Sequence, residues 1–218
     1  EPYRRQRQMC IRDRFYAVQL YADFSGGIDI SRGVSQLFGI DLAENFRRPY
    51  FSRNISEYWH RWHITLGAWF RDYVYIPLGG SRKGRWKTVR NLAIVWLLTG
   101  LWHGASMNFV LWGAWFGLLI IAEHLGMEKL LERLPAFFSW LYTMLAVVFG
   151  WVLFDTDSLG SALRFIGAMF GAGGSFASGG SWSLLSQAAV SLALCIFFSS
   201  GAAKNYIKQI GGEGSKVI

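Results

Sequence analysis

Residues 91–122 read NLAIVWLLTGLWHGASMNFVLWGAWFGLLIIA, a stretch without a single Asp, Glu, Lys or Arg. At about 1.5 Å of rise per residue, one helix of this length exceeds the roughly 30 Å hydrocarbon core of a bilayer. The stretch must therefore tilt, bend or re-enter the membrane. Gly100 and Gly104 interrupt it near the middle, with Trp102 and His103 between them. A re-entrant turn is one possibility at this point.

Two other apolar segments are long enough to cross a bilayer once. Residues 135–154 are uncharged and open with a proline, which helices tolerate at their first turn. Residues 184–203 are rich in the small side chains that let membrane helices pack closely. We therefore expect an all-α, polytopic transmembrane protein with candidate spans at about 91–122, 135–154 and 184–203.

Two amphipathic segments lie between these spans. Residues 123–133 carry several charges and predict a short helix or turn at the water interface. Residues 155–170 place apolar side chains at helical spacing and predict a helix lying along that interface.

The composition supports a membrane protein. Of the 218 residues, 52 % are hydrophobic and only 17 % are charged, whereas a soluble domain carries roughly 25 % charged residues. So little charge does not cover a soluble surface, and so much apolar area excludes disorder. The two cysteines, Cys10 and Cys195, lie far apart, which excludes a disulfide scaffold.

The net charge of +8 is concentrated in one segment. Residues 46–90 hold ten basic residues against Glu57 and Asp72, whereas the rest of the chain sums to zero. This basic block runs directly into the uncharged stretch, a position that favours the positive-inside bias and anionic headgroups over a nucleic-acid site. We expect the lipid bilayer as a partner and no nucleic acid.

Residues 1–14, EPYRRQRQMCIRDR, differ in composition from the remainder of the chain. Their end, MCIRDR, resembles the translation of a sequencing adapter, so this stretch is expected to be a non-native segment. The alternative is a real basic arm beside the membrane. In either case we expect the chain to be part of a longer protein, with residues 15–218 as its membrane domain.

His103 is the ionisable residue of the long uncharged stretch. Such a group is costly inside a membrane and indicates a functional site, although a neutral imidazole that only packs explains it about equally well. The flanking glycines favour function, because they allow close approach to the ring.

His60 and His63 are three residues apart, so on a helix they share a face. Glu57 makes a metal site conceivable, but the segment adds no carboxylate other than Asp72, and we expect no metal. The aromatic residues around them predict a belt at headgroup depth, with Arg61 and Arg71 extending to the interface. The belt comprises Tyr58, Trp59, Trp62, Trp69, Phe70, Tyr73 and Tyr75. His63 is expected to point with Trp59, Leu66 and Phe70 toward an apolar interior.

No GxSxG, P-loop or GxGxxG motif occurs in the sequence. A nucleophilic-serine or nucleotide-binding site therefore has no support, and the histidines favour base-assisted transfer without a covalent enzyme intermediate.

Three motifs, in order, resemble the membrane-bound O-acyltransferases, and in particular their bacterial alginate O-acetyltransferase branch. They are YADFSGGIDISRGVSQLFGI (21–40), NFRRPYFSRNISEYWHRWHITLGAWFRDYVYIPLGG (45–80) and LTGLWHGASMNFVLWG (98–113). The resemblance covers nearly all of residues 15–170, although Asp155 stands where an arginine is expected. It implies the C-terminal part of the family's multi-span fold in a bacterial inner membrane.

The resemblance also implies a site. His103 takes the place of the family's essential histidine and His63 that of the second histidine of this branch. We expect His103 to act as general base on an attacking hydroxyl or a relay thiol, and His63 to orient it or to donate to the oxyanion. The candidate substrate-binding residues are Trp102, Asn108, Trp59, Arg61, Arg71 and Asp72. Arg61, Arg71 and the basic loop at 82–90 are suited to an anionic donor.

The function expected is transfer of an acetyl or similar small acyl group from a thioester such as acetyl coenzyme A to an exported polysaccharide or a partner protein. The thioester is a substrate, and no bound cofactor is expected. An extracytoplasmic acyltransferase is a further candidate partner. D-alanyl transfer to teichoic acid, a proton-coupled transporter and a non-catalytic scaffold are the alternatives.

Overall fold

The computed structural model describes residues 16–170 and the isolated positions 186, 189 and 193. Residues 24–170 belong to one compact unit, and 16–23 to another. Within 16–170 every regular element is a helix, and the pairing of Phe46 with Trp62 is an isolated bridge. This part of the chain confirms the helical fold class. The predictions for residues 1–14 and for the span at 184–203 lie outside the described ranges, apart from the three isolated positions.

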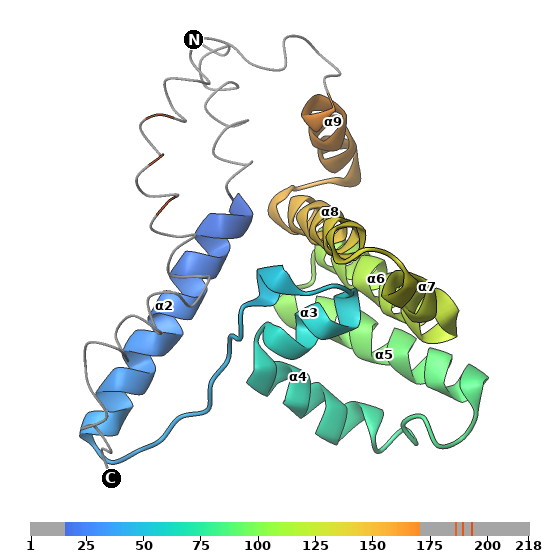
Figure 1. Ribbon diagram of the computed structural model, residues 1–218. Coiled ribbons are helices and arrows are strands. Elements are labelled where there is room, and N and C mark those ends of the chain that lie inside the picture. The colour runs from blue at the N-terminus through green and yellow to red at the C-terminus, as the bar shows by residue number, and fades with distance from the viewer. Residues whose placement is uncertain (1–15, 171–185, 187–188, 190–192, 194–218) are drawn as a thin grey trace. The chain divides into compact units, whose positions relative to one another are not determined.

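Most of the helices follow one another with short connections, whereas residues 38–48 and 76–84 form longer links (Figure 1). In chain order they are α2 (Tyr16–Leu37), η1 (Pro49–Phe51), α3 (Ile55–Arg61), α4 (Ile64–Phe70), η2 (Arg71–Tyr75), α5 (Arg85–His103), α6 (Met107–Ala122), η3 (Glu123–Met127), α7 (Glu128–Arg133), α8 (Ala136–Asp155) and α9 (Leu159–Met169). Elements η2 and η3 are π-helical turns that continue the helices before them, and η1 is a 3-10 turn.

The uncharged stretch 91–122 is not one helix. Helix α5 runs through Gly100 and ends at His103, and α6 begins at Met107. Gly104 between them has a φ of 151°, in the region that only glycine adopts without strain. The expected interruption of the helix is therefore present, and it falls at residues 104–106. Gly100 lies inside α5 and does not interrupt it.

Gly100 allows α5 to pack closely against α6. A Cβ atom at Gly113 would lie 3.1 Å from the Cα of Gly100 and also against the carbonyl oxygen of Trp96, and one at Gly117 would lie 2.9 Å from the Cβ of Trp96. Since the contacts move away from the turn in step along both helices, the pair is antiparallel. Glycines at both sides of the contact let the two backbones approach closely.

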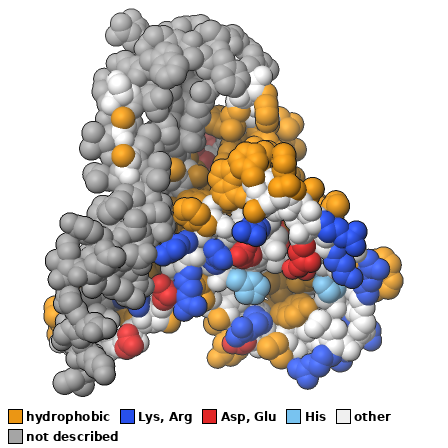
Figure 2. Space-filling view, in the orientation of Figure 1, with side chains coloured by type: hydrophobic (Ala, Val, Ile, Leu, Met, Phe, Trp, Pro, Cys, Tyr) orange, Lys and Arg blue, Asp and Glu red, His pale blue; other side chains and the backbone are white. Residues whose placement is uncertain are grey.

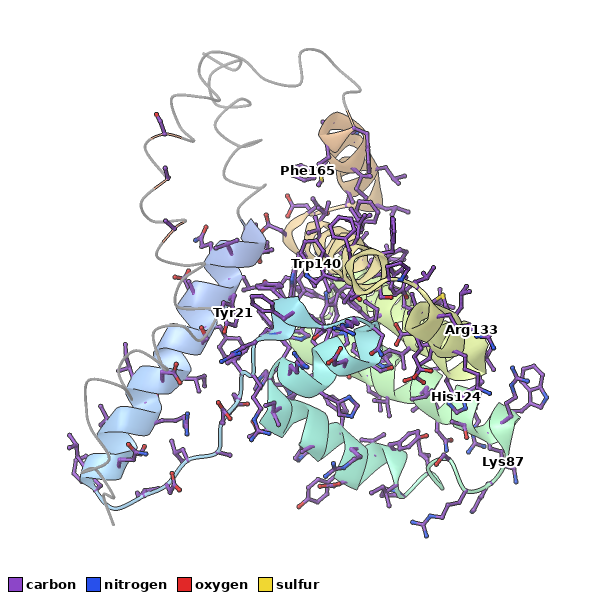
Figure 3. The ribbon with its side chains drawn as sticks, in the orientation of Figure 1. Tyr21, Lys87, His124, Arg133, Trp140 and Phe165 are labelled. Carbon is purple, nitrogen blue, oxygen red and sulfur yellow. The ribbon has the colours of Figure 1, made fainter. Side chains whose placement is uncertain are left out.

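The other end of this hairpin is charged. The guanidinium of Arg85, at the start of α5, donates a hydrogen bond of 2.9 Å to the carbonyl of Leu125, just after α6. Figure 3 shows Lys87 and His124 at this same end. The turn with His103 is therefore one helix length away, about 27 Å for the 19 residues of α5.

Two helices are long and apolar enough to cross a membrane, among the residues described. One is the continuous helix Met107–Arg133, formed by α6, η3 and α7, and the other is Ala136–Asp155, which is α8. The second matches the segment predicted at 135–154. The two helices are joined by the Trp115 indole N–H, which donates to the Ala146 carbonyl at 2.9 Å, and by the Phe116 ring, which packs against Gly150.

The two amphipathic segments are helical as expected. Residues 123–133 continue α6 as η3 and α7, and residues 159–169 form α9. The position of α9 along the membrane interface stays a prediction. Glu123 differs from the expectation of a solvated segment because its side chain is fully buried.

The core is aromatic and is centred on α3. The ring of Trp59 lies 5.0 Å from that of Trp96 on α5, and 5.5 and 4.9 Å from those of Trp112 and Phe116 on α6. Trp62 lies 5.1 Å from Trp151 on α8. Figure 1 shows α3 beside α6 and below α8, and α3 contacts both helices.

The predicted aromatic belt is therefore wrong for part of its members. Tyr58, Trp62 and Phe70 are buried in the core, whereas Trp69 and Tyr73 are exposed. Sequence spacing did not separate the two groups, because the helix that carries them ends at Arg61 and a new one starts at Ile64.

We predict that Gly113→Ala lowers the free energy of unfolding of the protein in detergent by about 1–3 kcal/mol and lowers its melting temperature, because the new methyl group meets the backbone of α5. Gly33→Ala in α2 is the matched control: nothing lies within 4 Å of its Cβ position, so alanine there leaves stability unchanged or raises it by up to about 1 kcal/mol. Equal melting temperatures for Gly113→Ala and the unchanged protein would show that the two helices do not touch at this glycine.

Candidate functional site

His103 is presented at the turn between α5 and α6. Its half-buried ring lies 4.9 Å from Trp112, 5.0 Å from Trp102 and 5.1 Å from Phe154, each contact nearly edge to face. Within residues 16–170 neither ring nitrogen has a hydrogen-bond partner. An imidazole in this setting keeps a lone pair available to an incoming group.

Two predicted substrate-binding residues lie at the same turn. Trp102 precedes His103 and is 56 % exposed, so its indole is open to a ligand. Asn108, in the first turn of α6, is half-buried and accepts a hydrogen bond from the Ser106 hydroxyl. The α5–α6 turn therefore gathers His103, Trp102 and Asn108 at one place.

His63 does not share a helical face with His60. Helix α3 ends at Arg61, and His63 adopts a left-handed conformation with φ 46° and ψ 56° between α3 and α4. The prediction that both rings project from one helix is wrong. His60 is exposed, and its Nδ1 pairs with the Ser56 carbonyl at 2.6 Å.

The half-buried His63 ring is held by Asn45. The Oδ1 atom of Asn45 lies 3.1 Å from His63 Nδ1 and accepts hydrogen bonds from the backbone N–H and the hydroxyl of Thr65, at 3.2 and 2.7 Å. The Phe24 ring closes one side of the imidazole at 4.9 Å, edge to face. Burial lowers the pKa of His63, which favours the neutral form of the ring.

The fold brings both histidines to the aromatic core, although they are forty positions apart in the sequence. The Trp112 ring lies 4.9 Å from His103, and the Phe24 ring, 4.9 Å from His63, lies 6.4 Å from Trp62. Within residues 16–170 neither imidazole is paired with a carboxylate. The group that orients an imidazole here is an amide oxygen, as in the Cys-His-Asn arrangement of papain-like proteases.

The remaining predicted site residues lie elsewhere. Arg61 pairs with Glu57 on α3, and Arg71 pairs with its neighbour Asp72 at 2.7 Å on the surface. Hydrogen bonding to Arg71 lowers the pKa of Asp72. Trp59 packs among core side chains, and its part in substrate binding stays a prediction. In Figure 2 the Lys, Arg and His side chains gather below the hydrophobic ones on the face in view.

The Glu57-x-x-His60 pattern is occupied by local contacts. Glu57 accepts hydrogen bonds from the Arg61 guanidinium and, at 2.6 Å, from the Arg53 N–H. No three His, Cys, Asp or Glu residues among those described are grouped as they are around a metal ion.

Two residues of this region, Asn45 and Glu123, were not predicted from the sequence. The buried Glu123 carboxylate accepts from the Ile55 N–H at 2.6 Å and from the N–H and hydroxyl of Ser56 at 2.9 and 2.8 Å. It thereby caps the start of α3 from the end of α6. In the sequence Glu123 is marked only as an acidic residue directly after an uncharged segment. The same pattern fits the start of a solvated segment, so it did not predict a buried carboxylate.

The described residues form an α-helical fold with membrane-length helices, and two half-buried imidazoles lie beside its aromatic core. The chain belongs to the membrane-bound O-acyltransferase (MBOAT) family, whose family model matches residues 3–156. That range includes residues 3–14, whose adapter origin stays a prediction.

Several groups of proteins are similar to this chain. The probable alginate O-acetylase AlgI of Pseudomonas putida is 48 % identical over 159 residues, which are 72 % of this chain and 33 % of the relative. The peptidoglycan O-acetyltransferase of Helicobacter pylori is 39 % identical, over 73 % of this chain and 31 % of its own length. The teichoic acid D-alanyltransferase of Bacillus subtilis is 35 % identical, over 48 % and 28 %. The chain spans about a third of the length of these relatives.

We predict that Glu123→Gln destabilises the protein by about 1–3 kcal/mol, because an amide keeps only one acceptor oxygen for the buried N–H groups of α3. Thermal unfolding in detergent measures the change. Glu128→Gln, at an exposed acid one turn further along, is the control and leaves the melting temperature unchanged. Equal effects of the two variants would contradict the capping role of Glu123.

Proposed function

We propose that this protein is a membrane-bound O-acyltransferase that moves an acetyl or similar small acyl group from a thioester to a hydroxyl of an exported polysaccharide or a partner protein. The observation that carries the proposal is the half-buried imidazole of His103, held at the turn between α5 and α6 with no hydrogen-bond partner for either nitrogen within residues 16–170. Membership of the family and the names of the similar proteins support the reaction type.

His103 acts as the general base in this proposal. As the hydroxyl oxygen bonds to the thioester carbonyl carbon, its proton passes to the imidazole. The carbon–sulfur bond then breaks, and the thiolate leaves and takes the proton back, so that an ester and a thiol are formed. A neutral imidazole is suited to this work, and a positioned base contributes about 10²- to 10⁴-fold in rate.

The surroundings of His103 suit an acyl chain better than a charged headgroup. Trp102, Trp112 and Phe154 provide apolar faces next to the ring, and Asn108 offers an amide close to it. The basic residues at 82–90, which include the first turns of α5, lie at the far end of that helix from His103. They would therefore act on an anionic donor at the entrance and not at the reacting carbonyl. Arg61, Arg71 and Asp72 are assigned to that entrance and not to the reacting centre.

The cargo is better described as acetyl than as D-alanyl. The alginate and peptidoglycan O-acetylating relatives match over 72–78 % of the chain, whereas the D-alanyltransferases match over 48–52 %. Within this proposal the protein is a multi-pass protein of a bacterial inner membrane. It works with the acyl donor and with a polysaccharide or an extracytoplasmic acyltransferase.

We predict that His103→Gln lowers acyl transfer to the polysaccharide by about 10²-fold or more while leaving membrane insertion and melting temperature unchanged, because glutamine fills the space without a base. The rate of acyl transfer is measured as the incorporation of radiolabelled acetyl from acetyl coenzyme A into the polysaccharide by membrane vesicles. His124→Gln, an exposed histidine at the far end of the hairpin, is the control and keeps full activity.

Two results would contradict the proposal. Normal acyl incorporation by His103→Gln would leave only a scaffold role for this protein. Loss of proton-driven solute uptake in the same vesicles, with acylation intact, would identify a transporter.

A further inference from the structure

Asn45 is the buried polar residue that contacts the second histidine, and its orientation is fixed by the backbone. The N–H of Thr65 can only donate, and it lies 3.2 Å from Oδ1 of Asn45. The Nδ2 atom on the other side faces the Ala43 carbonyl at 3.4 Å, which can only accept. Both ends of the amide therefore agree, and the oxygen of Asn45 is the atom that faces His63.

An amide oxygen facing an imidazole nitrogen decides where the proton sits. Oδ1 of Asn45 accepts only, so His63 Nδ1, at 3.1 Å, must carry the hydrogen. In a neutral imidazole only one nitrogen is protonated, and the other holds a lone pair. Nε2 of His63 is thus an acceptor, and it has no hydrogen-bond partner within residues 16–170.

The backbone around the ring is built to keep this arrangement. The carbonyl of Asn45 accepts from the N–H of Ile64 at 3.1 Å, and the N–H of Arg47 donates to the carbonyl of Arg61 at 2.9 Å. These bonds clamp the residues before and after His63 to the segment that carries Asn45. Within 16–170 the positive φ angles at residues other than glycine are those of Arg48 and His63, one on each side of the clamp. Such strain costs about 1 kcal/mol or more and persists only where the surroundings enforce it.

We propose that Asn45 is a positioning residue that holds His63 as the Nδ1–H tautomer, so that Nε2 accepts a proton in the acyl-transfer step. This inference rests on the proposed function. It changes the role expected for His63, because a neutral imidazole with a bare Nε2 cannot donate a hydrogen bond to an oxyanion. His63 then shares the work of proton acceptance with His103, taking a proton from the acceptor hydroxyl and returning it to the leaving thiolate.

The tautomer of His63 is measured by nuclear magnetic resonance, which does not depend on an assay of acyl transfer. The protein is produced with ¹⁵N-labelled histidine, and the His63 signals are identified by their loss in His63→Gln. At neutral pH we expect a protonated Nδ1 and an unprotonated Nε2. A protonated Nε2 in the unchanged protein overturns the inference, whether or not the protein is an acyltransferase.

Three variants test the role in the reaction. Asn45→Ala removes the acceptor, so both tautomers are populated and kcat falls by about tenfold or more with a smaller change in KM, as for other histidines that lose their orienting partner. Asn45→Asp keeps an acceptor oxygen at the same place, so it keeps the Nδ1–H tautomer and much of the activity. Thr65→Val removes one hydrogen bond to Asn45 but leaves the amide facing His63, and its rate stays close to that of the unchanged protein.

The pH profile gives the most specific readout. A carboxylate next to Nδ1–H favours the charged imidazolium, so the acid limb of the rate profile moves to higher pH in Asn45→Asp. A profile of Asn45→Asp identical to that of Asn45→Ala, in both rate and shape, overturns the inference. Full acylation by His103→Gln with the Nδ1–H tautomer intact would overturn the proposed function and leave the structural claim about Asn45 standing.

Discussion

Close contact between α5 and α6 at Gly100 and Gly113 sets the positions of the elements around the site. With only hydrogen on these two Cα atoms, the backbones lie close enough that Trp96 fits against Gly117 further along. The hairpin turn at residues 104–106 is thereby placed next to α8, and His103 is fixed among Trp112 and Phe154. Lipid gives no hydrophobic drive between helices, so fit of this kind supplies much of their association.

The short helix α3 packs against α5 and α6 through one tryptophan, and its N-terminus is buried. Trp59 fills the space between α5 and α6, and Glu123 satisfies the first N–H groups of the helix. A seven-residue helix has little stability of its own. Its position is therefore set by these tertiary contacts, and they in turn fix where the chain leaves α3 toward His63.

The two histidines of the candidate site lie on two segments that are held in place in different ways. His103 belongs to the rigid hairpin, whereas His63 belongs to a strained link that is clamped to Asn45 and Thr65. His103 lies among aromatic side chains and His63 lies beside the Phe24 ring, and neither imidazole pairs with a carboxylate within residues 16–170.

Composition and periodicity alone were enough to predict the helical class, the helix at α8 and the break near Gly104. Contacts across the fold were needed to establish that 91–122 folds back on itself, that Tyr58 and Trp62 belong to the core, and that Asn45 faces His63. Helical spacing assumes an unbroken helix, and the chain breaks at Trp62 because Asn45 and Thr65 hold His63 in a left-handed conformation. Contacts between residues far apart in the chain leave no periodic trace in it.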